Sequence, residues 1–189
     1  MRYRLVLVPC LVAVLAVFGA CGKEIGDACV LGTDCSPNGD RLCDPSSVDG
    51  YCTIQGCDVD TCPDEAVCVR FFTGSFSNKE CDYDVSKVPE GTEARLCSLD
   101  EICALNGAHR EGDDLLGGHC VARSSEVRFC MRKCGSDGDC RGDSNDDGRV
   151  DYECRNVDRM IEHGGEPLLE DGALVDDRAP KFCAAAPPP

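Results

Sequence analysis

Residues 1–22, which read MRYRLVLVPCLVAVLAVFGACG, decide how the rest of this chain can fold. The stretch begins with two basic residues, Arg2 and Arg4, continues as an apolar run over 5–18, and ends on small residues. A basic start, an apolar run of about 14 residues and a small-residue exit are the three parts of a secretory signal peptide. The sequence therefore predicts export from the cytoplasm into a compartment where disulfide bonds form and persist.

The end of this stretch indicates how the signal is processed. Phe18, Gly19, Ala20 and Cys21 resemble the bacterial lipobox, whose usual form is Leu-(Ala/Ser/Thr)-(Gly/Ala)-Cys, with Phe in place of Leu. The resemblance implies a signal peptide over 1–20, cleavage before Cys21, a diacylglycerol thioether on its sulfur and a further acyl chain on its new amino group. Two or more acyl chains give stable membrane attachment, whereas one is marginal. Cys21 is therefore the predicted lipidation site.

Two other fates of the N-terminal stretch are open. Cleavage after Gly22 would suit an ordinary signal peptidase, because Ala20 and Gly22 are small. The alternative to lipidation is a soluble secreted protein in which Cys21 is the first cysteine of the framework. An uncleaved membrane helix is disfavoured, because the apolar run is shorter than the roughly 20 residues that a span needs and contains Pro9.

The residues after the signal are poor in core-building side chains. The whole chain has no Trp, four Tyr and six Phe, against 20 Gly and 10 Pro. A chain of this composition buries too little apolar surface to offset its conformational entropy without additional crosslinks.

Cysteine supplies those crosslinks. The chain has 18 cysteines; Cys10 leaves with the signal and Cys21 is the proposed lipid site. An even set in an exported chain predicts a disulfide framework, and the cysteine count alone leaves about two million pairings open. The predicted fold is small and disulfide-rich, with short β-hairpins and loops, one or two short helices and little hydrophobic core. The remaining sixteen cysteines are Cys29, Cys35, Cys43, Cys52, Cys57, Cys62, Cys68, Cys81, Cys97, Cys103, Cys120, Cys130, Cys134, Cys140, Cys154 and Cys183.

Zinc binding is the competing use of many cysteines. Structural zinc sites usually carry a Cys-x2–4-Cys pair, often with His. The closest spacings here are Cys52-x4-Cys57, Cys57-x4-Cys62 and Cys130-x3-Cys134, and the chain has three histidines. None of these spacings is Cys-x2-Cys, His119 is the only histidine next to a cysteine, and the signal predicts export, so we expect no zinc. The lack of Cys-x2-Cys also disfavours a thioredoxin-like redox motif.

Charge restricts the possible partners. Removal of the signal leaves 17 basic against 35 acidic residues, a formal charge of −18. This balance excludes nucleic acid as a partner and excludes adhesion to anionic lipid by charge. Any membrane attachment must then come from acyl chains at Cys21.

The cysteine spacing suggests three regions after a lipid-anchored tether over 21–28. They are a Cys-rich module over 29–56, a central region over 57–129 and a region over 130–183 that carries an acidic loop, followed by a Pro-rich tail over 184–189. In the first module, turn signals at 37–40 and 49–50 flank two short extended segments, 40–43 and 50–52.

The local pattern predicts further elements. The run at 66–72, rich in β-branched and aromatic residues, predicts a strand. Ser98 and Glu101 have capping-box spacing and predict a short helix over 99–105. Residues 119–123 and 126–132 alternate like the two strands of one hairpin joined at 124–125.

A weak internal similarity in cysteine spacing suggests a repeated cysteine hairpin. The spacing of Cys35, Cys43 and Cys52 can be set beside that of Cys134, Cys140 and Cys154. Both runs close on a Tyr near the last cysteine.

The spacing and composition as a whole resemble the Cys-rich lipoproteins of unassigned function found in some Gram-negative bacteria. The resemblance covers most of the mature chain. It implies a cell-envelope location, as an outer-membrane lipoprotein that faces the periplasm or the cell surface.

One stretch carries the pattern of a metal site. Residues 143–151 read DSNDDGRVD and match the opening of a calcium loop, D-x-[DN]-x-[DN]-G. Oxygen ligands suit this hard cation, so a structural Ca²⁺ is a candidate cofactor. The twelfth position, where an EF-hand needs Glu, is Cys154, so the loop is more similar to the shorter loops of extracellular calcium modules. The alternative is a solvated acidic loop. The candidate ligands are Asp143, Asn145, Asp147, the carbonyl of Arg149, and Asp151.

No motif indicates catalysis, because the chain has no Gly-x-Ser-x-Gly, His-Glu-x-x-His or phosphate-binding loop. We therefore expect a non-catalytic lipoprotein with a structural or interaction role toward an unknown protein or polysaccharide. The alternative is a secreted, disulfide-rich inhibitor or toxin-like module without an anchor, which would present a rigid loop near 110–111 or 123–124.

Overall fold

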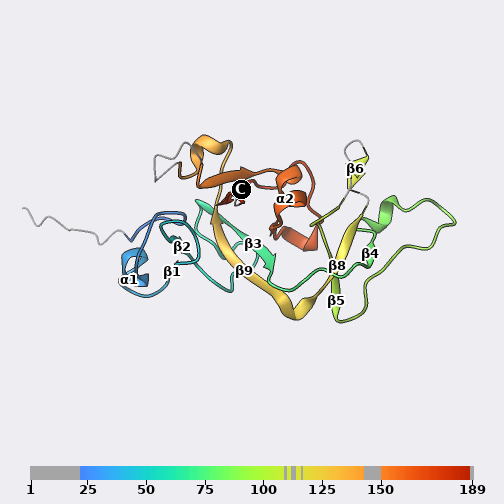
Figure 1. Cartoon of the computed structure of the whole chain (residues 1–189), viewed down its shortest axis with the longest axis horizontal. Helices are drawn as coiled ribbons and strands as arrows, with labels where there is room; N and C mark the ends of the chain where they lie inside the picture. Colours follow the sequence, from blue (N-terminus) through green and yellow to red (C-terminus); the bar gives the residue numbers. More distant parts are fainter. Residues whose placement is uncertain (1–21, 109, 112–113, 116, 143–149, 188–189) are drawn as a thin grey trace, which may run out of the picture.

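The computed structural model describes residues 22–187, apart from 109, 112–113, 116 and 143–149. In this part of the chain the strands are short and are joined by long loops (Figure 1). The strands are β1 Leu42–Asp44, β2 Tyr51–Thr53, β3 Ala66–Phe72, β4 Glu80–Cys81, β5 Glu101–Ala104, β6 Arg110–Glu111, β7 Asp114–Leu115, β8 Gly118–Ala122, β9 Glu126–Arg132, β10 Tyr152–Arg155, β11 Glu166–Pro167 and β12 Phe182–Ala185. The helices are α1 Gly32–Cys35 and α2 Val157–His163, with 3-10 turns η1 Val85–Lys87, η2 Arg123–Ser125, η3 Asp137–Asp139 and η4 Glu170–Gly172.

All sixteen framework cysteines are paired, which confirms the predicted disulfide-rich fold. The S–S distances run from 1.93 to 2.06 Å and the Cα–Cα distances from 5.4 to 5.9 Å. The eight disulfides fall into four units of four cysteines each. In every unit the first cysteine bonds to the third, and the second bonds to the fourth. Unit 1 is Cys29, Cys35, Cys43 and Cys52; unit 2 is Cys57, Cys62, Cys68 and Cys130; unit 3 is Cys81, Cys97, Cys103 and Cys120; unit 4 is Cys134, Cys140, Cys154 and Cys183.

The four units also share one backbone arrangement. The third and fourth cysteines always lie directly opposite each other on two antiparallel strands. Each of them is bonded back to the segment before the strand pair, so two neighbouring disulfides fasten that segment to the paired strands. The facing pairs are Cys43 and Cys52, Cys68 and Cys130, Cys103 and Cys120, and Cys154 and Cys183.

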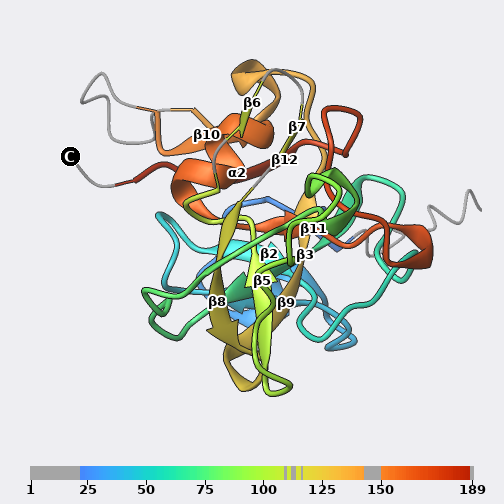
Figure 2. The same cartoon turned by 90° about the vertical axis from the view of Figure 1, so that its right-hand side faces the viewer.

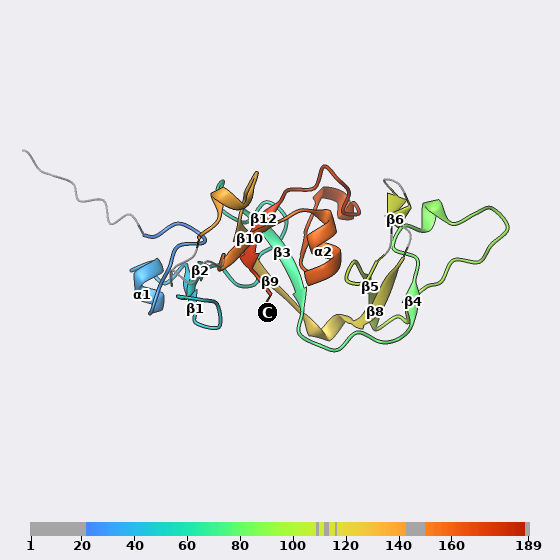
Figure 3. The same cartoon turned by 45° about the horizontal axis from the view of Figure 1, so that its top comes forward.

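The units are nested rather than strung in a row. Unit 3 is inserted between β3 and β9, the two strands of unit 2, which pair along seven residues from Ala66↔Arg132 to Phe72↔Glu126. Strand β9 spans the boundary expected between 129 and 130. The molecule is elongated, with unit 1 at one end, the β4–β8–β5 sheet of unit 3 at the other, and the β11–β3–β9 sheet between them (Figures 1 and 3). Seen along the long axis, the unit 3 sheet lies in front of β3 and β9 (Figure 2).

Several local predictions are confirmed. The expected strand at 66–72 is β3, and the extended segments near Cys43 and Cys52 are β1 and β2, which pair with each other. The turn between β1 and β2 requires glycine, because Gly50 has φ +67° and a side chain there would meet the carbonyl oxygen of Cys29 at 2.1 Å.

The helix predicted over 99–105 is wrong. Only one capping hydrogen bond forms, since the Ser98 N–H donates to Glu101 Oε2 at 3.0 Å, whereas the Glu101 N–H donates to the Ser98 backbone carbonyl at 3.0 Å and not to its hydroxyl. These bonds close a turn, and the chain continues as strand β5. Pairing of β5 with β8 and the disulfide from Cys103 to Cys81 hold it extended.

The hairpin predicted from 119–123 and 126–132 is also wrong, although both segments are strands. Strand β8 pairs with β4 and β5, whereas β9 pairs with β3. The intervening 3-10 turn η2 carries the chain from one sheet to the next instead of folding it back. The repeated cysteine hairpin is present, but its register differs from the expected one, because Cys29 and Cys35 of unit 1 correspond to Cys134 and Cys140 of unit 4.

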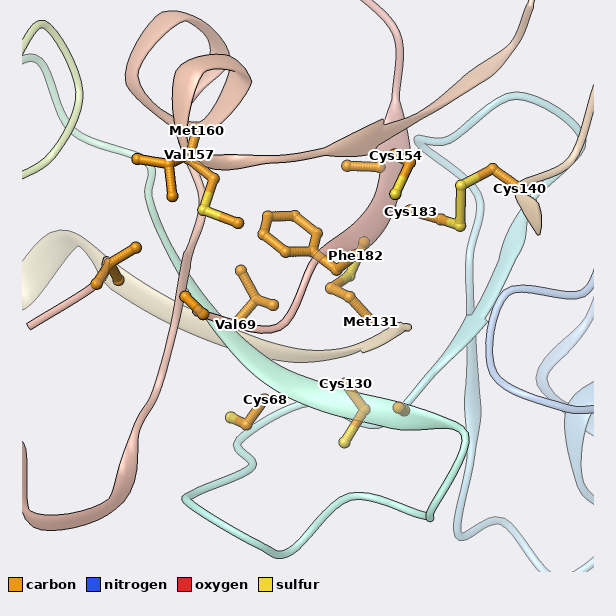
Figure 4. Packing of buried hydrophobic residues seen from close by; sticks show 14 of the residues in the cluster. Cys68, Val69, Cys130, Met131, Cys140, Cys154, Val157, Met160, Phe182 and Cys183 are labelled. Carbon is orange, nitrogen blue, oxygen red and sulfur yellow. A yellow bond between two sulfur atoms is a disulfide. The ribbon is translucent and has the colours of Figure 1, made fainter. Parts of the chain in front are cut away.

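A small core lies where units 2 and 4 meet. Phe182 of β12 is fully buried between α2, which supplies Met160, and the sheet strands, which supply Val69 and Met131 (Figure 4). Disulfide sulfurs border the same core, so crosslinks and apolar side chains share the packing.

Units 1 and 4 are joined by two aromatic rings and one cation. Tyr51 and Tyr152 stack with ring centroids 5.5 Å apart, and the guanidinium of Arg141 lies 4.2 Å from the Tyr152 centroid. Arg141 also donates to the Gly50 carbonyl at 2.6 Å. Burial raises the pKa of Tyr51 to about 12, so its hydroxyl remains protonated and accepts from the Arg132 N–H at 3.0 Å.

The segment 21–28, predicted to be a lipid-anchored tether, is packed onto unit 1 over its described residues. Ile25 is fully buried, the Gly26 N–H donates to the Cys52 carbonyl at 2.9 Å, and the Cys52 N–H donates to the Asp27 carbonyl at 2.9 Å. The folded domain therefore begins close to residue 22.

Candidate functional site

The largest hollow that we describe lies between the unit 3 sheet and the segment 167–175. Its volume is about 490 Å³. We call it the Glu166 cleft, after the carboxylate buried behind it. Residues from β3, β5 and the chain after β11 line it, so three parts of the sequence far from one another meet there.

Two residues that line the cleft, Arg70 and Tyr83, contact the buried Glu166. In the β11–β3 pair, Glu166 lies opposite Arg70, and Arg70 Nη2 lies 2.6 Å from Glu166 Oε2. The Tyr83 hydroxyl donates to the same oxygen at 3.4 Å, and the Leu105 N–H donates to Oε1 at 2.6 Å. Glu166 is only 2% exposed. Its carboxylate therefore fastens strand β11 to β3, to the residue after β5 and to the loop after β4.

Burial and this carboxylate set the charge states of its neighbours. Burial by itself lowers the pKa of Arg70, but the charge and hydrogen bonds of Glu166 outweigh it and the net shift is upward. Burial, followed by the charge of Glu166, raises the pKa of the Tyr83 phenol. Arg70 is thus cationic and Tyr83 neutral near neutral pH, and the carboxylate has one ionic and two neutral partners.

The rim of the cleft is apolar and exposed. Leu99 is 99% exposed, Leu96 63% and Leu174 42%, and all three line the hollow. Arg95 lies among them and is paired with Asp82 at 2.6 Å. Exposed leucines gathered around a hollow are typical of a surface that binds another molecule.

A second hollow of about 310 Å³, the aromatic cavity, is lined by Phe71, Phe129, Met131, Arg155 and His163, among others. Arg155 is buried and donates to the carbonyls of Gly164 and Ala185 at 2.8 Å each, which is a structural role. His163 Nε2 lies 3.9 Å from Glu153 Oε1, beyond hydrogen-bond distance.

Some of the sites predicted from the sequence lie in the described part of the chain, and others lie outside it. The sixteen framework cysteines are all brought together in pairs. Cys21, Asp143, Asn145, Asp147 and Arg149 lie outside the described residues. Asp151 is described and precedes β10, where its carbonyl accepts from the Ala186 N–H at 2.9 Å.

In each unit, three cysteine sulfurs lie within 4.8 Å of one another, which is close enough for three ligands of one metal ion. These sulfurs are covalently joined as disulfides.

The sequence patterns did not identify Glu166 as a site residue. Glu166 is preceded by Gly164 and Gly165, both with positive φ. The sequence pattern that could have identified it is a single acid between two glycines and Pro167-Leu168-Leu169. A carboxylate in such an apolar setting needs a partner if it is buried.

No protein-family model, curated protein sequence or solved structure matches the chain. Among the described residues, no helix has both the length and the apolar character needed to cross a membrane. The fold and the eight disulfides define a small disulfide-rich protein of extracytoplasmic type.

Proposed function

We propose that this chain is a non-catalytic lipoprotein of the cell envelope, anchored through acyl chains at Cys21 in the outer membrane. The main support for the proposal is that the cysteines of the mature chain are odd in number, so one is left over when the others pair. The sixteen from Cys29 onward pair among themselves, and Cys10 leaves with the predicted signal. Cys21 therefore has no partner left in the mature chain, and an exported protein would otherwise carry a reactive free thiol. Lipidation uses that sulfur.

Replacement of the anchor residue tests this assignment. We expect Cys21→Ala to move the protein from the membrane fraction to the soluble fraction, because the acyl chains supply the attachment. The measurement is immunoblotting of fractionated cells, together with mass spectrometry of the mature N-terminus. Leu99→Ala, a change at an exposed residue of the opposite end, should leave the distribution unchanged. A Cys21→Ala protein that still pellets with membranes would contradict the proposal.

Within that role, we infer that the Glu166 cleft binds a protein partner rather than a polysaccharide. The rim offers leucine side chains, which have no group to hydrogen-bond sugar hydroxyls. Burial of apolar surface is the dominant favourable term in protein association. The buried ion pair of Arg70 and Glu166 behind the rim keeps the two walls of the cleft in fixed positions.

The alternative is a secreted inhibitor that presents a locked loop to a protease. Of its two candidate loops, 123–124 lies in the 3-10 turn η2. The Ser125 carbonyl there accepts from the Thr73 N–H at 3.0 Å. A tight turn of this kind differs from the extended backbone that a protease cleft accepts. The other candidate, 110–111, is strand β6, whose backbone is already paired with β7. We therefore favour the lipoprotein.

We also propose that Ca²⁺ binds residues 143–151 and stabilises the folded protein. If Asp143, Asn145 and Asp147 are ligands, millimolar Ca²⁺ should raise the melting temperature, because a ligand that binds only the folded state stabilises it. Asp147→Ala should abolish that rise, while Asp58→Ala, an exposed acid of unit 2, should retain it. Equal melting temperatures with Ca²⁺ and with chelator would remove calcium from the proposal.

A further inference from the structure

Two consecutive aliphatic residues project from unit 1 into solvent. Val30 is 82% exposed and Leu31 is 62% exposed. Both backbone N–H groups donate to Asp34 Oδ2 at 2.9 Å, which fixes the two residues at the start of α1. The apolar pair is therefore a formed feature at the tip of the molecule, which we call the Val30–Leu31 tip.

The described chain begins beside this tip. A side chain at Gly22 would meet the carbonyl oxygen of Cys35 at 2.6 Å, so residue 22 lies against the end of α1. Since α1 has four residues, its two ends are about 6 Å apart. The preceding residue is Cys21, one Cα–Cα step of about 3.8 Å away.

The residues after Gly22 leave little slack between the anchor and the domain. Arg41 Nη1 donates to the Lys23 carbonyl, Lys23 Nζ donates to the Ala28 carbonyl at 2.7 Å, and Ile25 is buried. An acyl group at Cys21 would consequently hold unit 1 against the bilayer surface, with the Val30–Leu31 tip within reach of the lipid.

We propose that the Val30–Leu31 tip inserts into the bilayer next to the acylated Cys21 and orients the whole domain. This inference rests on the proposed lipid anchor. The long axis of the molecule runs from unit 1 to unit 3 (Figures 1 and 3), so insertion of the tip directs the Glu166 cleft away from the membrane. The apolar tip and the acyl chains act together. The net charge of the mature chain disfavours attraction to anionic lipid, which leaves apolar burial as the source of contact.

A single tryptophan tests the insertion, because the chain has none of its own. Leu31→Trp and Leu99→Trp are made in the full acylated protein, purified from membranes and reconstituted in phosphatidylcholine vesicles with brominated acyl chains. Bromine quenches tryptophan only at close range. We expect the emission of Trp at 31 to fall roughly two-fold relative to unbrominated vesicles, and that at 99 to stay unchanged. Addition of Val30→Asp to the Leu31→Trp protein should restore most of the emission.

The outcomes separate this inference from the anchor. Flotation of the vesicles reports the anchor directly. A protein that floats but shows no quenching at 31 overturns the insertion and leaves the lipoprotein intact. Quenching at both 31 and 99 overturns the upright orientation. A protein that does not float removes the anchor, and this inference with it.

Discussion

Reduction of the eight disulfides should unfold the protein. With tris(2-carboxyethyl)phosphine in the absence of denaturant, we expect loss of the near-ultraviolet circular dichroism signal and of any cooperative thermal transition. Each disulfide contributes about 2–4 kcal/mol, mainly by restricting the unfolded chain, whereas a whole domain is stable by only about 5–15 kcal/mol. The core around Phe182 is too small to replace eight such contributions. Before reduction, thiol titration of the mature protein should find close to no free thiol.

Single pairs provide the matched comparison. The Cys62–Cys130 bond joins residues 68 positions apart, and the Cys57–Cys68 bond of the same unit joins residues 11 apart. Chain-entropy estimates give losses of about 4 and about 3 kcal/mol on replacing each pair by Ser, so the longer loop should cost more in urea unfolding. A reduced protein that keeps a sharp thermal transition would refute the role that we assign to the disulfides.

Glu166→Ala should be the most damaging single substitution outside the cysteines. It leaves the Arg70 guanidinium, the Tyr83 hydroxyl and the Leu105 N–H without their common acceptor. Loss of one partner of a fully buried ion pair costs about 3–5 kcal/mol, and the expected loss is near the lower figure because the Arg70 side chain is 18% exposed. Urea unfolding monitored by circular dichroism measures this loss in free energy of unfolding.

Glu80→Ala is the control for Glu166→Ala. Glu80 also pairs with an arginine, Arg95, but its side chain is 65% exposed. Exposed ion pairs contribute at most about 1 kcal/mol, so this variant should unfold close to the wild-type urea concentration. Equal effects of the two substitutions would show that the Glu166 network does not hold the cleft together.

Local features were predictable where short-range chemistry decides them. The β-branched and aromatic run at 66–72 forms a strand because those side chains suit a pleated, half-buried surface. The turn signal at Asp49-Gly50 works because Gly50 accepts a positive φ. The capping pattern at Ser98 was correct for one hydrogen bond, from the Ser98 N–H to the Glu101 carboxylate. It failed as a helix because the ladder with β8 and the disulfide of Cys103 act on the residues that follow.

The sequence by itself determined the class of this protein: an even set of framework cysteines and few core residues, together with the predicted export signal, indicate a crosslinked fold. Only the tertiary structure decided which sulfurs meet. A bond such as Cys62–Cys130 depends on the register of β3 against β9, and that register is set by side chains far apart along the chain. The same holds for Glu166, whose partners come from three distant segments. Local patterns encode turns and strands, whereas pairing over long loops follows from how the strands pack.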